Sequence, residues 1–134
     1  MEVRKEERFG LRSQEDIVRT RQIVRTWSVN LGFNLVEQTK IVTAASELAR
    51  NTVEYGGGGE LTLRHLANGA RAGLCLEFVD QGPGIADLDL ALKDGYTTGG
   101  GLGLGLSGSR RLMNEFSIES SPGNGTRVRV VRWK

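Results

Sequence analysis

The hydrophobic pattern of this chain changes its period at Glu60, and this change constrains the fold more than any other feature of the sequence. Before Glu60, apolar residues recur at helical spacing and predict two long helices, over 14–31 and 35–55. After it, apolar and polar residues alternate, which predicts two strands, 60–67 and 72–80, joined by a hairpin. Because helices and strands are segregated along the chain, the pattern indicates an α+β fold.

Local signals mark the ends of the two long helices. Ser13 offers an N-cap hydroxyl to the first helix, and Gly32 follows it as a candidate C-cap. Asn34 and Glu37 resemble a capping box at the start of the second helix, which ends at four glycines, 56–59. The apolar stripes expected to face the core are Ile17, Val24, Trp27 and Leu31 in the first helix and Val42, Ala45, Ala49 and Val53 in the second.

Shorter segments complete the expected order of elements. They are an edge strand over 4–11, a glycine–proline turn over 82–84, an acidic amphipathic stretch over 86–93, a glycine-rich loop over 99–105, a helix over 106–116, and strands over 117–121 and 126–133 around a turn at 122–125. A chain of 134 residues is too short to bury two separate cores. We therefore expect one domain over residues 1–134.

The charge balance and the cysteine content argue against several classes of protein. Eighteen basic and 16 acidic residues leave a net charge of +2, too small for a dedicated phosphate-backbone binder or a polybasic membrane anchor. No apolar run approaches the roughly 18 residues that span a bilayer, and the charged N-terminus has no secretory segment behind it. The single cysteine, Cys75, and the single histidine, His65, provide neither an internal disulfide nor a zinc site. We expect a cytoplasmic protein that binds neither nucleic acid nor membrane.

Glu47 and Asn51 lie four residues apart in the second helix, so their side chains share one face. A carboxylate there can accept a proton, and an amide oxygen suits Mg²⁺. Taken alone, however, the pair is more typical of a solvated helix face.

Asp80 ends an apolar strand and enters a turn with Gly82 and Gly84, where a ligand can approach the backbone closely. Its carboxylate can accept a hydrogen bond from an exocyclic amine such as that of adenine. An Asx turn, in which Asp80 bonds only its own backbone, explains this fragment equally well.

Glycine makes up 19 of 134 residues, about twice the usual 7 per cent. Six glycines between 99 and 108 lead into a predicted helix, so backbone N–H groups and a helix N-terminus can face an anion such as phosphate. Gly103, Gly105 and Gly108 match G-x-G-x-x-G, but no strand precedes them directly, as a Rossmann site requires. A flexible linker is the alternative.

Two further features receive structural interpretations. Arg127, Arg129 and Arg132 alternate with valines on the last strand, which is typical of a solvated sheet face. Cys75, between two leucines, is most simply a buried strand thiol.

Four motifs, taken in order, resemble the ATP-binding motifs of the GHKL superfamily, which includes DNA gyrase B subunits, MutL, histidine kinases and small bacterial anti-sigma kinases. They are ELARN at 47–51, DQGPG at 80–84, the glycine–leucine loop at 99–105 and NGT at 124–126. The short length, the phrase DGYTTGGGLGLGL and the following RRLMNEF look most like the RsbT-type serine kinases of the stressosome. The nearest other branch is the anti-sigma factor kinases.

The resemblance implies a two-layer α/β sandwich of the Bergerat type, with a mixed, mostly antiparallel sheet of four or five strands and three helices on one face. It also implies that Glu47 is the general base, that Asn51 is the Mg²⁺ ligand and that Asp80 accepts from the adenine amino group. The other implied nucleotide-binding residues are Gly82, Gly84, Thr126 and the loop residues Gly99, Gly100, Gly101, Leu102, Gly103, Leu104 and Gly105. Residues 86–98 would form a short lid.

The expected function is that of an ATP- and Mg²⁺-dependent serine/threonine protein kinase in a partner-switching stress response. It would phosphorylate a STAS-domain antagonist-type protein and bind a serine phosphatase or another downstream regulator. Two alternatives stay open: an anti-sigma factor kinase that sequesters a sigma factor, and a nucleotide-gated binding module that transfers no phosphoryl group. A homodimer also stays open, with Trp27 and Trp133 either at its interface or in the core.

Overall fold

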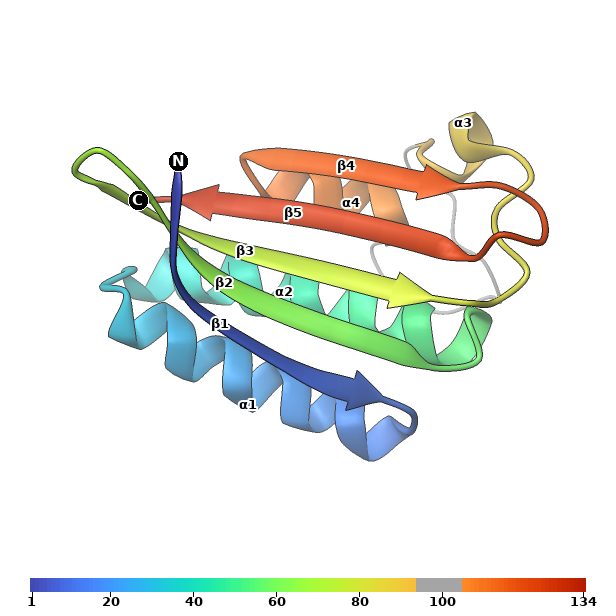
Figure 1. Cartoon of the computed structure of the whole chain (residues 1–134), viewed down its shortest axis with the longest axis horizontal. Helices are drawn as coiled ribbons and strands as arrows, with labels where there is room; N and C mark the ends of the chain where they lie inside the picture. The colour runs from blue at the N-terminus through green and yellow to red at the C-terminus, as the bar shows by residue number, and fades with distance from the viewer. Residues whose placement is uncertain (94–104) are drawn as a thin grey trace.

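A computed structural model describes residues 1–93 and 105–134 of the chain and shows a five-stranded sheet beside a layer of helices (Figure 1). The strands are β1 (Glu2–Leu11), β2 (Gly59–Asn68), β3 (Arg71–Asp80), β4 (Glu115–Ser120) and β5 (Thr126–Trp133). The helices are α1 (Gln14–Asn30), α2 (Leu35–Arg50), α3 (Leu88–Ala91) and α4 (Gly105–Leu112), and a π-helical turn, η1 (Asn51–Tyr55), continues α2. The predicted two-layer α+β fold is confirmed.

The strand order across the sheet is β1-β2-β3-β5-β4, and all of these neighbouring pairs are antiparallel. The described sheet is therefore antiparallel throughout and contains none of the parallel pairs that a mixed sheet would have. β4 and β3 run in the same direction, but β5 returns from β4 through a hairpin and lies between them. The predicted edge strand is confirmed as β1, which begins two residues earlier than expected.

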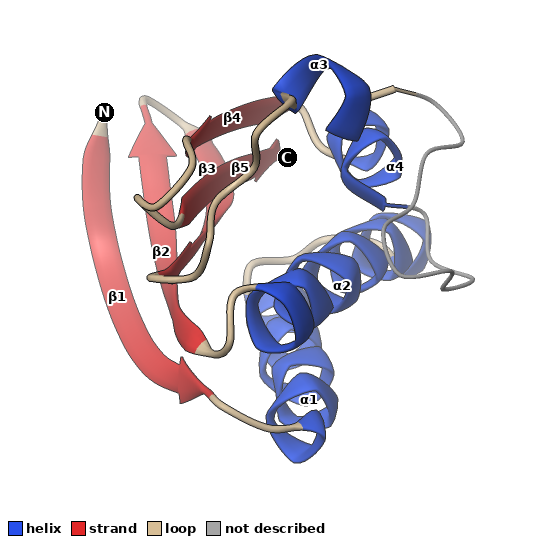
Figure 2. Cartoon of the chain, turned by 90° about the vertical axis from the view of Figure 1, so that its right-hand side faces the viewer, coloured by secondary structure: helices blue, strands red, loops and turns tan. Residues whose placement is uncertain are grey.

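The helices α1, α2 and α4 form the second layer, and Figure 2 shows them together on one side of the sheet. α2 lies in the middle and packs against both α1 and α4. Its buried positions repeat with a helical period: Ile41, Val42, Ala44, Ala45, Leu48 and Ala49. No helix in the described part of the chain combines the length and the apolar character needed to cross a membrane.

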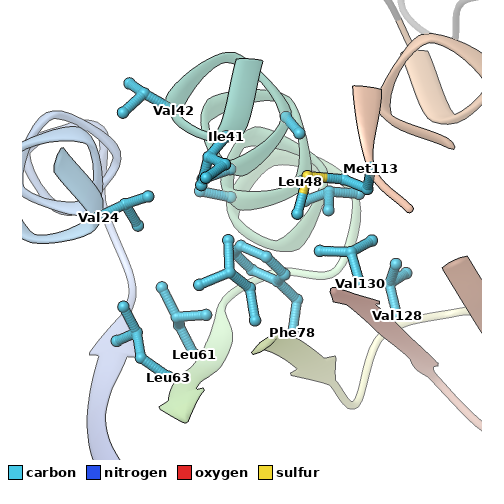
Figure 3. Close-up of a cluster of buried hydrophobic side chains, with 14 of the residues drawn as sticks. Val24, Ile41, Val42, Leu48, Leu61, Leu63, Phe78, Met113, Val128 and Val130 are labelled. Atoms are coloured by element: carbon cyan, nitrogen blue, oxygen red, sulfur yellow. The ribbon is translucent and has the colours of Figure 1, made fainter. Parts of the chain in front are cut away.

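The main core lies between the two layers (Figure 3). Phe78 of β3 lies at its centre, with Leu61 of β2 on one side and Val130 of β5 on the other, and all three are almost completely buried. Burying a side chain of this kind contributes roughly 1.5–3 kcal/mol relative to leaving it exposed. Trp27 belongs to this core, whereas Trp133 packs in a second cluster with Leu66, Cys75 and Val131.

The sequence signals at the helix ends have mixed outcomes. The capping box at the start of α2 is confirmed, because the Asn34 side chain accepts from the Glu37 N–H at 2.8 Å and Glu37 accepts from the Asn34 N–H at 3.3 Å. The predicted Ser13 cap is wrong in its chemistry: Ser13 stands at the N-cap, but its side chain makes no capping hydrogen bond. The Asp16 carboxylate instead accepts from the N–H of Arg12 at 2.8 Å.

Two predicted helices differ in detail from the structure. The helix expected over 35–55 keeps its length, but its last turn, Asn51–Tyr55, is π-helical. The helix expected over 106–116 ends at Leu112, and strand β4 begins at Glu115 instead of residue 117. The helix ends early because the Asn114 N–H donates to the Val131 carbonyl at 2.9 Å, which starts the pairing with β5.

Both ends of the chain lie at one end of the sheet (Figure 1). Glu2 pairs with Ala67, and the Lys134 N–H donates to the Ala72 carbonyl at 2.9 Å, so both ends flank the β2–β3 hairpin. The other end of the same two strands carries Asp80, which pairs with Gly59. The functional candidates therefore lie at the opposite end of the sheet from the termini.

Candidate functional site

A cavity of about 400 Å³ opens between the C-terminal end of α2, η1, β3, β5 and the segments around α3 and α4. Its volume is typical of a site for a small ligand. Five of the residues singled out from the sequence line it: Asn51, Asp80, Gly84, Gly105 and Thr126. They come from four separate stretches of the chain, which the fold brings together.

Asp80 is the buried acid of this cavity, with 8% of its surface exposed. Its Oδ1 accepts from the Gly82 N–H at 2.9 Å, so the local Asx-type bond predicted as an alternative is present. Burial raises the pKa of Asp80 above its ordinary value, although hydrogen bonds from the backbone of Gly82 and Thr126 act against this effect. The carboxylate thus both closes the local turn and faces the cavity.

Glycines allow the backbone to close around Asp80. A Cβ at Gly56 would lie 2.5 Å from Asp80 Oδ2, and a Cβ at Gly82 would lie 2.7 Å from the Cα of Gly56. Gly84 has a φ of +79°, and a Cβ there would collide with the Ser121 carbonyl. A side chain at Gly56 would therefore fill the space beside the carboxylate, and side chains at Gly82 and Gly84 would collide with neighbouring backbone.

Asn51 begins the π-helical turn and lines the cavity, while Glu47 lies one turn earlier on α2. Glu47 is not among the residues that line the described cavity, although its side chain is only 14% exposed. Its Oε1 lies 3.8 Å from Nη1 of Arg50, whose Nε lies 3.8 Å from Oε2 of Glu54. Arg50 therefore holds two carboxylates beside the start of the turn.

The π-helical turn was not predicted from the sequence. The Gly56 N–H donates to the Asn51 carbonyl, five residues back, at 3.0 Å, and the Thr52 hydroxyl donates to the Leu48 carbonyl at 3.1 Å. This wide turn brings Thr52 and Gly56 into the cavity wall. The run of glycines after the helix was the available signal, because only glycine fits at 56 against Asp80.

A hydroxyl pair closes the cavity on the β4–β5 side. Ser120 Oγ lies 2.8 Å from Thr126 Oγ1 and accepts from the Ile85 N–H at 2.8 Å. It also donates to the Gly125 carbonyl at 2.9 Å. Thr126 could be singled out from the sequence but Ser120 could not, because a serine at a strand end carries no distinctive pattern.

The remaining walls of the cavity are largely apolar, and none of the described lining residues is a lysine or an arginine. Leu48, Phe78 and Val128 form the inner wall, and Leu90 and Ala91 of α3 lie on the lid side. Residues 86–93, which include α3, are the described part of the predicted lid. Among the described residues there is no group of three or more His, Cys, Asp or Glu side chains that could hold a metal ion. A divalent ion would therefore depend on phosphate oxygens or water for most of its ligands.

Several predicted loop residues fall outside the described residues. These are Gly99, Gly100, Gly101, Leu102, Gly103 and Leu104, together with lid residues 94–98. Gly105 is described: it begins α4 and lines the cavity. The predicted phosphate-binding loop is thus described only at its last residue.

The arginines of β5 form ion pairs with neighbouring strands and a hydrogen bond with the end of α4. Arg127 lies 2.8 Å from Glu77, Arg129 lies 3.7 Å from Glu115, and Arg132 donates to the Leu112 carbonyl at 3.1 Å. Cys75 is fully buried, and burial raises the pKa of its thiol. These residues therefore have structural roles on the sheet.

Comparison with known proteins shows the family of this chain. The model of the histidine kinase-, DNA gyrase B- and HSP90-like ATPase family matches residues 36–134. Serine/threonine-protein kinase RsbT of Bacillus subtilis (strain 168) is 46% identical over 118 residues, which are 88% of this chain and 89% of that protein. The anti-sigma F factor of Thermoanaerobacter sp. (strain X514) is 29% identical over 119 residues, 84% of this chain and 82% of that protein.

Solved structures share the fold at lower identity. The RsbU and RsbW domains of Rv1364c from Mycobacterium tuberculosis superpose with a TM-score of 0.66 at 19% identity, over 96% of this chain and 32% of that one. The mycobacterial sensor histidine kinase MprB superposes with a TM-score of 0.54 at 18% identity, over 96% of this chain and 97% of that one. The family match over residues 36–134 and the 46% identity to RsbT show that the chain belongs to the histidine kinase-, DNA gyrase B- and HSP90-like ATPase family and, within it, to the serine/threonine-protein kinases of the RsbT type.

Proposed function

We propose that this protein transfers the γ-phosphoryl group of ATP to a serine or threonine of a STAS-domain antagonist-type protein, with Mg²⁺ as its metal. The observation that carries the proposal is that Asn51, Asp80, Gly84, Gly105 and Thr126 line one cavity in a chain that is 46% identical to the kinase RsbT. We further propose that residues 1–134 act as one kinase domain.

The lining of the cavity fits an adenine nucleotide. A buried carboxylate, Asp80, provides an acceptor for the adenine amino group, and the apolar side chains of Leu48 and Phe78 can contact the faces of a flat base. The absence of a Cβ at Gly56 leaves room beside that carboxylate. Polar groups at one point of an otherwise apolar wall fix the orientation of a ligand.

The phosphate end needs another source of positive charge, because no lysine or arginine lines the described cavity. A magnesium ion held by the Asn51 amide oxygen would neutralise the phosphate charge when the nucleotide is bound. The N-terminus of α4 at Gly105 offers backbone N–H groups to the same anion. We assign residues 99–104 to the same phosphate-binding loop and 86–98 to the lid.

Glu47 is the proposed general base. It accepts the proton of the incoming hydroxyl as the oxygen of that hydroxyl forms a bond to the γ-phosphorus and the bond to ADP breaks. Arg50, 3.8 Å from Glu47, limits the directions in which this carboxylate can point. Glu47 lies one helical turn before Asn51, which lines the cavity, and 14% of its side chain is exposed, so we propose that the substrate hydroxyl reaches it from outside the cavity.

The test is transfer of labelled phosphate from ATP to a STAS-domain protein encoded beside this one. Glu47→Gln should lower the rate about 100-fold or more while nucleotide binding persists, because it removes only the base. Asn51→Ala should lower both the rate and the Mg²⁺ dependence of binding. Glu54→Gln is the matched control, since Glu54 also pairs with Arg50 but lies farther along the turn, and it should transfer phosphate normally. Full transfer by Glu47→Gln would contradict the proposed mechanism.

Partner switching is the regulatory part of the proposal. Both the RsbT-type kinase and the anti-sigma F factors among the relatives support a regulator that exchanges protein partners. We propose that phosphorylation releases the STAS-domain protein and lets the kinase bind a serine phosphatase or a similar regulator in a stress response. Because ATP is the phosphoryl donor, we place this exchange in the cytoplasm. Co-purification with each partner, with and without ATP, would show whether the exchange occurs.

A second candidate function is that of an anti-sigma factor, which the 29% identity to the anti-sigma F factors favours. In that case the protein would retain a sigma factor in a pull-down and release it when a STAS-domain protein is added. Retention of sigma without phosphoryl transfer would favour this candidate or a nucleotide-gated binding module over the kinase.

A further inference from the structure

We propose that Ser120 is a specificity-determining residue of the nucleotide site: it fixes the hydroxyl proton of Thr126, so that Thr126 offers a bound base only an acceptor. The inference rests on the proposed function, since it requires a purine nucleotide in the cavity. Ser120 contacts no ligand in this scheme and acts through Thr126, which lines the cavity.

The Ser120 hydroxyl group makes three polar contacts. Ser120 Oγ lies 2.8 Å from the Ile85 nitrogen, 2.9 Å from the Gly125 carbonyl oxygen and 2.8 Å from Thr126 Oγ1. A serine hydroxyl has one proton to donate and two lone pairs that accept. Three partners therefore use its full hydrogen-bonding capacity.

Two of these contacts leave no choice of direction. The Ile85 N–H can only donate, so it occupies one lone pair of Ser120 Oγ. The Gly125 carbonyl can only accept, so it takes the Ser120 proton. The remaining contact must then run from Thr126 to Ser120: the Thr126 hydroxyl donates to the second lone pair.

This direction decides what Thr126 presents to a ligand. With its proton committed to Ser120, the Thr126 hydroxyl has only lone pairs left to offer. Thr126 is also the partner of Asp80 in the pairing of β3 with β5, and both residues line the cavity. A carboxylate and an oriented hydroxyl thus form a pair of neighbouring acceptors.

Two neighbouring acceptors favour a base that carries hydrogen-bond donors at the matching position. The amino group at position 6 of adenine has two N–H donors, whereas hypoxanthine has a carbonyl oxygen at the same position. A site that pairs with an amino group rejects an analogue that lacks it, because its own polar groups are then left unpaired. Ser120 should therefore strengthen the preference for ATP over inosine triphosphate.

The experiment compares the affinities of the full-length protein for Mg·ATP and Mg·inosine triphosphate by calorimetry. In Ser120→Ala the Thr126 hydroxyl is free to turn and donate, so the preference for ATP should fall about five-fold, the usual effect of one hydrogen bond. Inosine triphosphate should bind as well as, or better than, it binds to the wild type. Thr126→Val should reduce the preference similarly, and the double variant should show no further loss. Ser120→Thr keeps the hydroxyl and should restore the preference, while Ser117→Ala, on an exposed position of the same strand, should change nothing.

Alternative outcomes separate this inference from the proposed function. If Ser120→Ala weakened both nucleotides equally, Ser120 would serve only to tie Ile85 to β4, and the inference would be overturned while ATP binding stood. An unchanged preference for ATP over inosine triphosphate in Thr126→Val would also overturn the inference. This variant keeps the hydrogen bond between Ile85 and Ser120, so it serves as the test if Ser120→Ala folds poorly. If the wild type bound neither nucleotide, the proposed function itself would fail, and the inference with it.

Discussion

At the scale of single residues, Asp80 combines two properties: it ends the central strand β3, and it is almost entirely buried. Burial raises the pKa of Asp80 because the charged form loses its hydration. Folding therefore favours the protonated form of this carboxyl. Consequently, its contribution to the free energy of unfolding decreases as pH rises through the interval from the unfolded to the folded pKa.

Nucleotide binding should depend on pH in the opposite sense. Asp80 must be ionised to act as a pure acceptor for an amino group, so the affinity for Mg·ATP should fall as pH is lowered toward its raised pKa. The loss should begin at a higher pH than for an ordinary aspartate, whose pKa is about 3.9. Calorimetric titrations from about pH 8 to about pH 5 would measure it. The Asp80→Asn variant is the control for protonation of the nucleotide itself. This variant should bind Mg·ATP weakly, and its affinity should depend less on pH than that of the wild type. An equally steep pH dependence would contradict the role assigned to Asp80.

At the scale of the elements, the two long helices begin in different ways. α2 has a complete capping box between Asn34 and Glu37, whereas the Ser13 side chain makes no capping hydrogen bond to α1. Removing the Asn34 side chain should lower the free energy of unfolding by about 1 kcal/mol. For a chain of this length that corresponds to a melting temperature lower by about 4 °C.

Ser13→Ala is the matched control for Asn34→Ala. Both serve as N-caps, but only Asn34 bonds a backbone N–H with its side chain. Thermal unfolding followed by circular dichroism should therefore show a clear shift for Asn34→Ala and a much smaller one for Ser13→Ala. Equal shifts would mean that the hydrogen bond is not the stabilising interaction.

The elements also show which parts of the fold were predictable. Caps and hairpins depend on neighbouring residues, so the start of α2 and the β2–β3 hairpin followed from local patterns. The end of α4 did not, because the Asn114 side chain accepts from the Trp133 N–H, 19 residues away, and this long-range bond favours the strand. Residues 113–116 have helical composition, but they lie outside α4, and Glu115 and Phe116 pair with β5 as the start of β4.

The same distinction applies to the candidate site. Asn51, Asp80 and Thr126 belong to motifs that resemble a known family, so the amino-acid pattern alone was enough to single them out. Gly56 and Ser120 were not identified in this way, because their importance comes from neighbours that are distant in sequence, Asp80 for the glycine and Ile85 for the serine. The Ser120 contact leaves no trace in the local pattern, and the glycine run at 56–59 indicates only that the backbone is unusual there, not that Asp80 is the neighbour.

At the scale of the whole molecule, a chain of charges crosses four strands of the sheet. Glu6 of β1 lies 2.7 Å from Arg64 of β2, which lies 3.5 Å from Glu77 of β3, and Arg127 of β5 lies 2.8 Å from the same Glu77. Burial alone would raise the pKa of Glu77, but hydrogen bonds from Arg127 and the charge of Arg64 lower it overall. Glu77 therefore stabilises the fold when it is ionised.

The sign of this shift predicts how acid affects the molecule. A carboxylate with a lowered folded pKa contributes stability above its unfolded value, about 4.5, and loses it as pH falls through the folded pKa. Denaturant unfolding at several pH values should show a steeper loss of stability below this point for the wild type than for Glu77→Gln. Glu15→Gln, a variant of an exposed carboxylate outside the charge chain, should behave like the wild type. Parallel curves for Glu77→Gln and the wild type would show that the charge chain contributes nothing.

The position of the two termini has a practical consequence for the use and the evolution of this fold. Both termini flank the β2–β3 hairpin, whereas the cavity lies at the other end of these strands. A domain fused to either terminus should therefore leave the cavity open. Affinity handles, fluorescent reporters or a tethered partner can be attached at these points without shielding the site from its substrate.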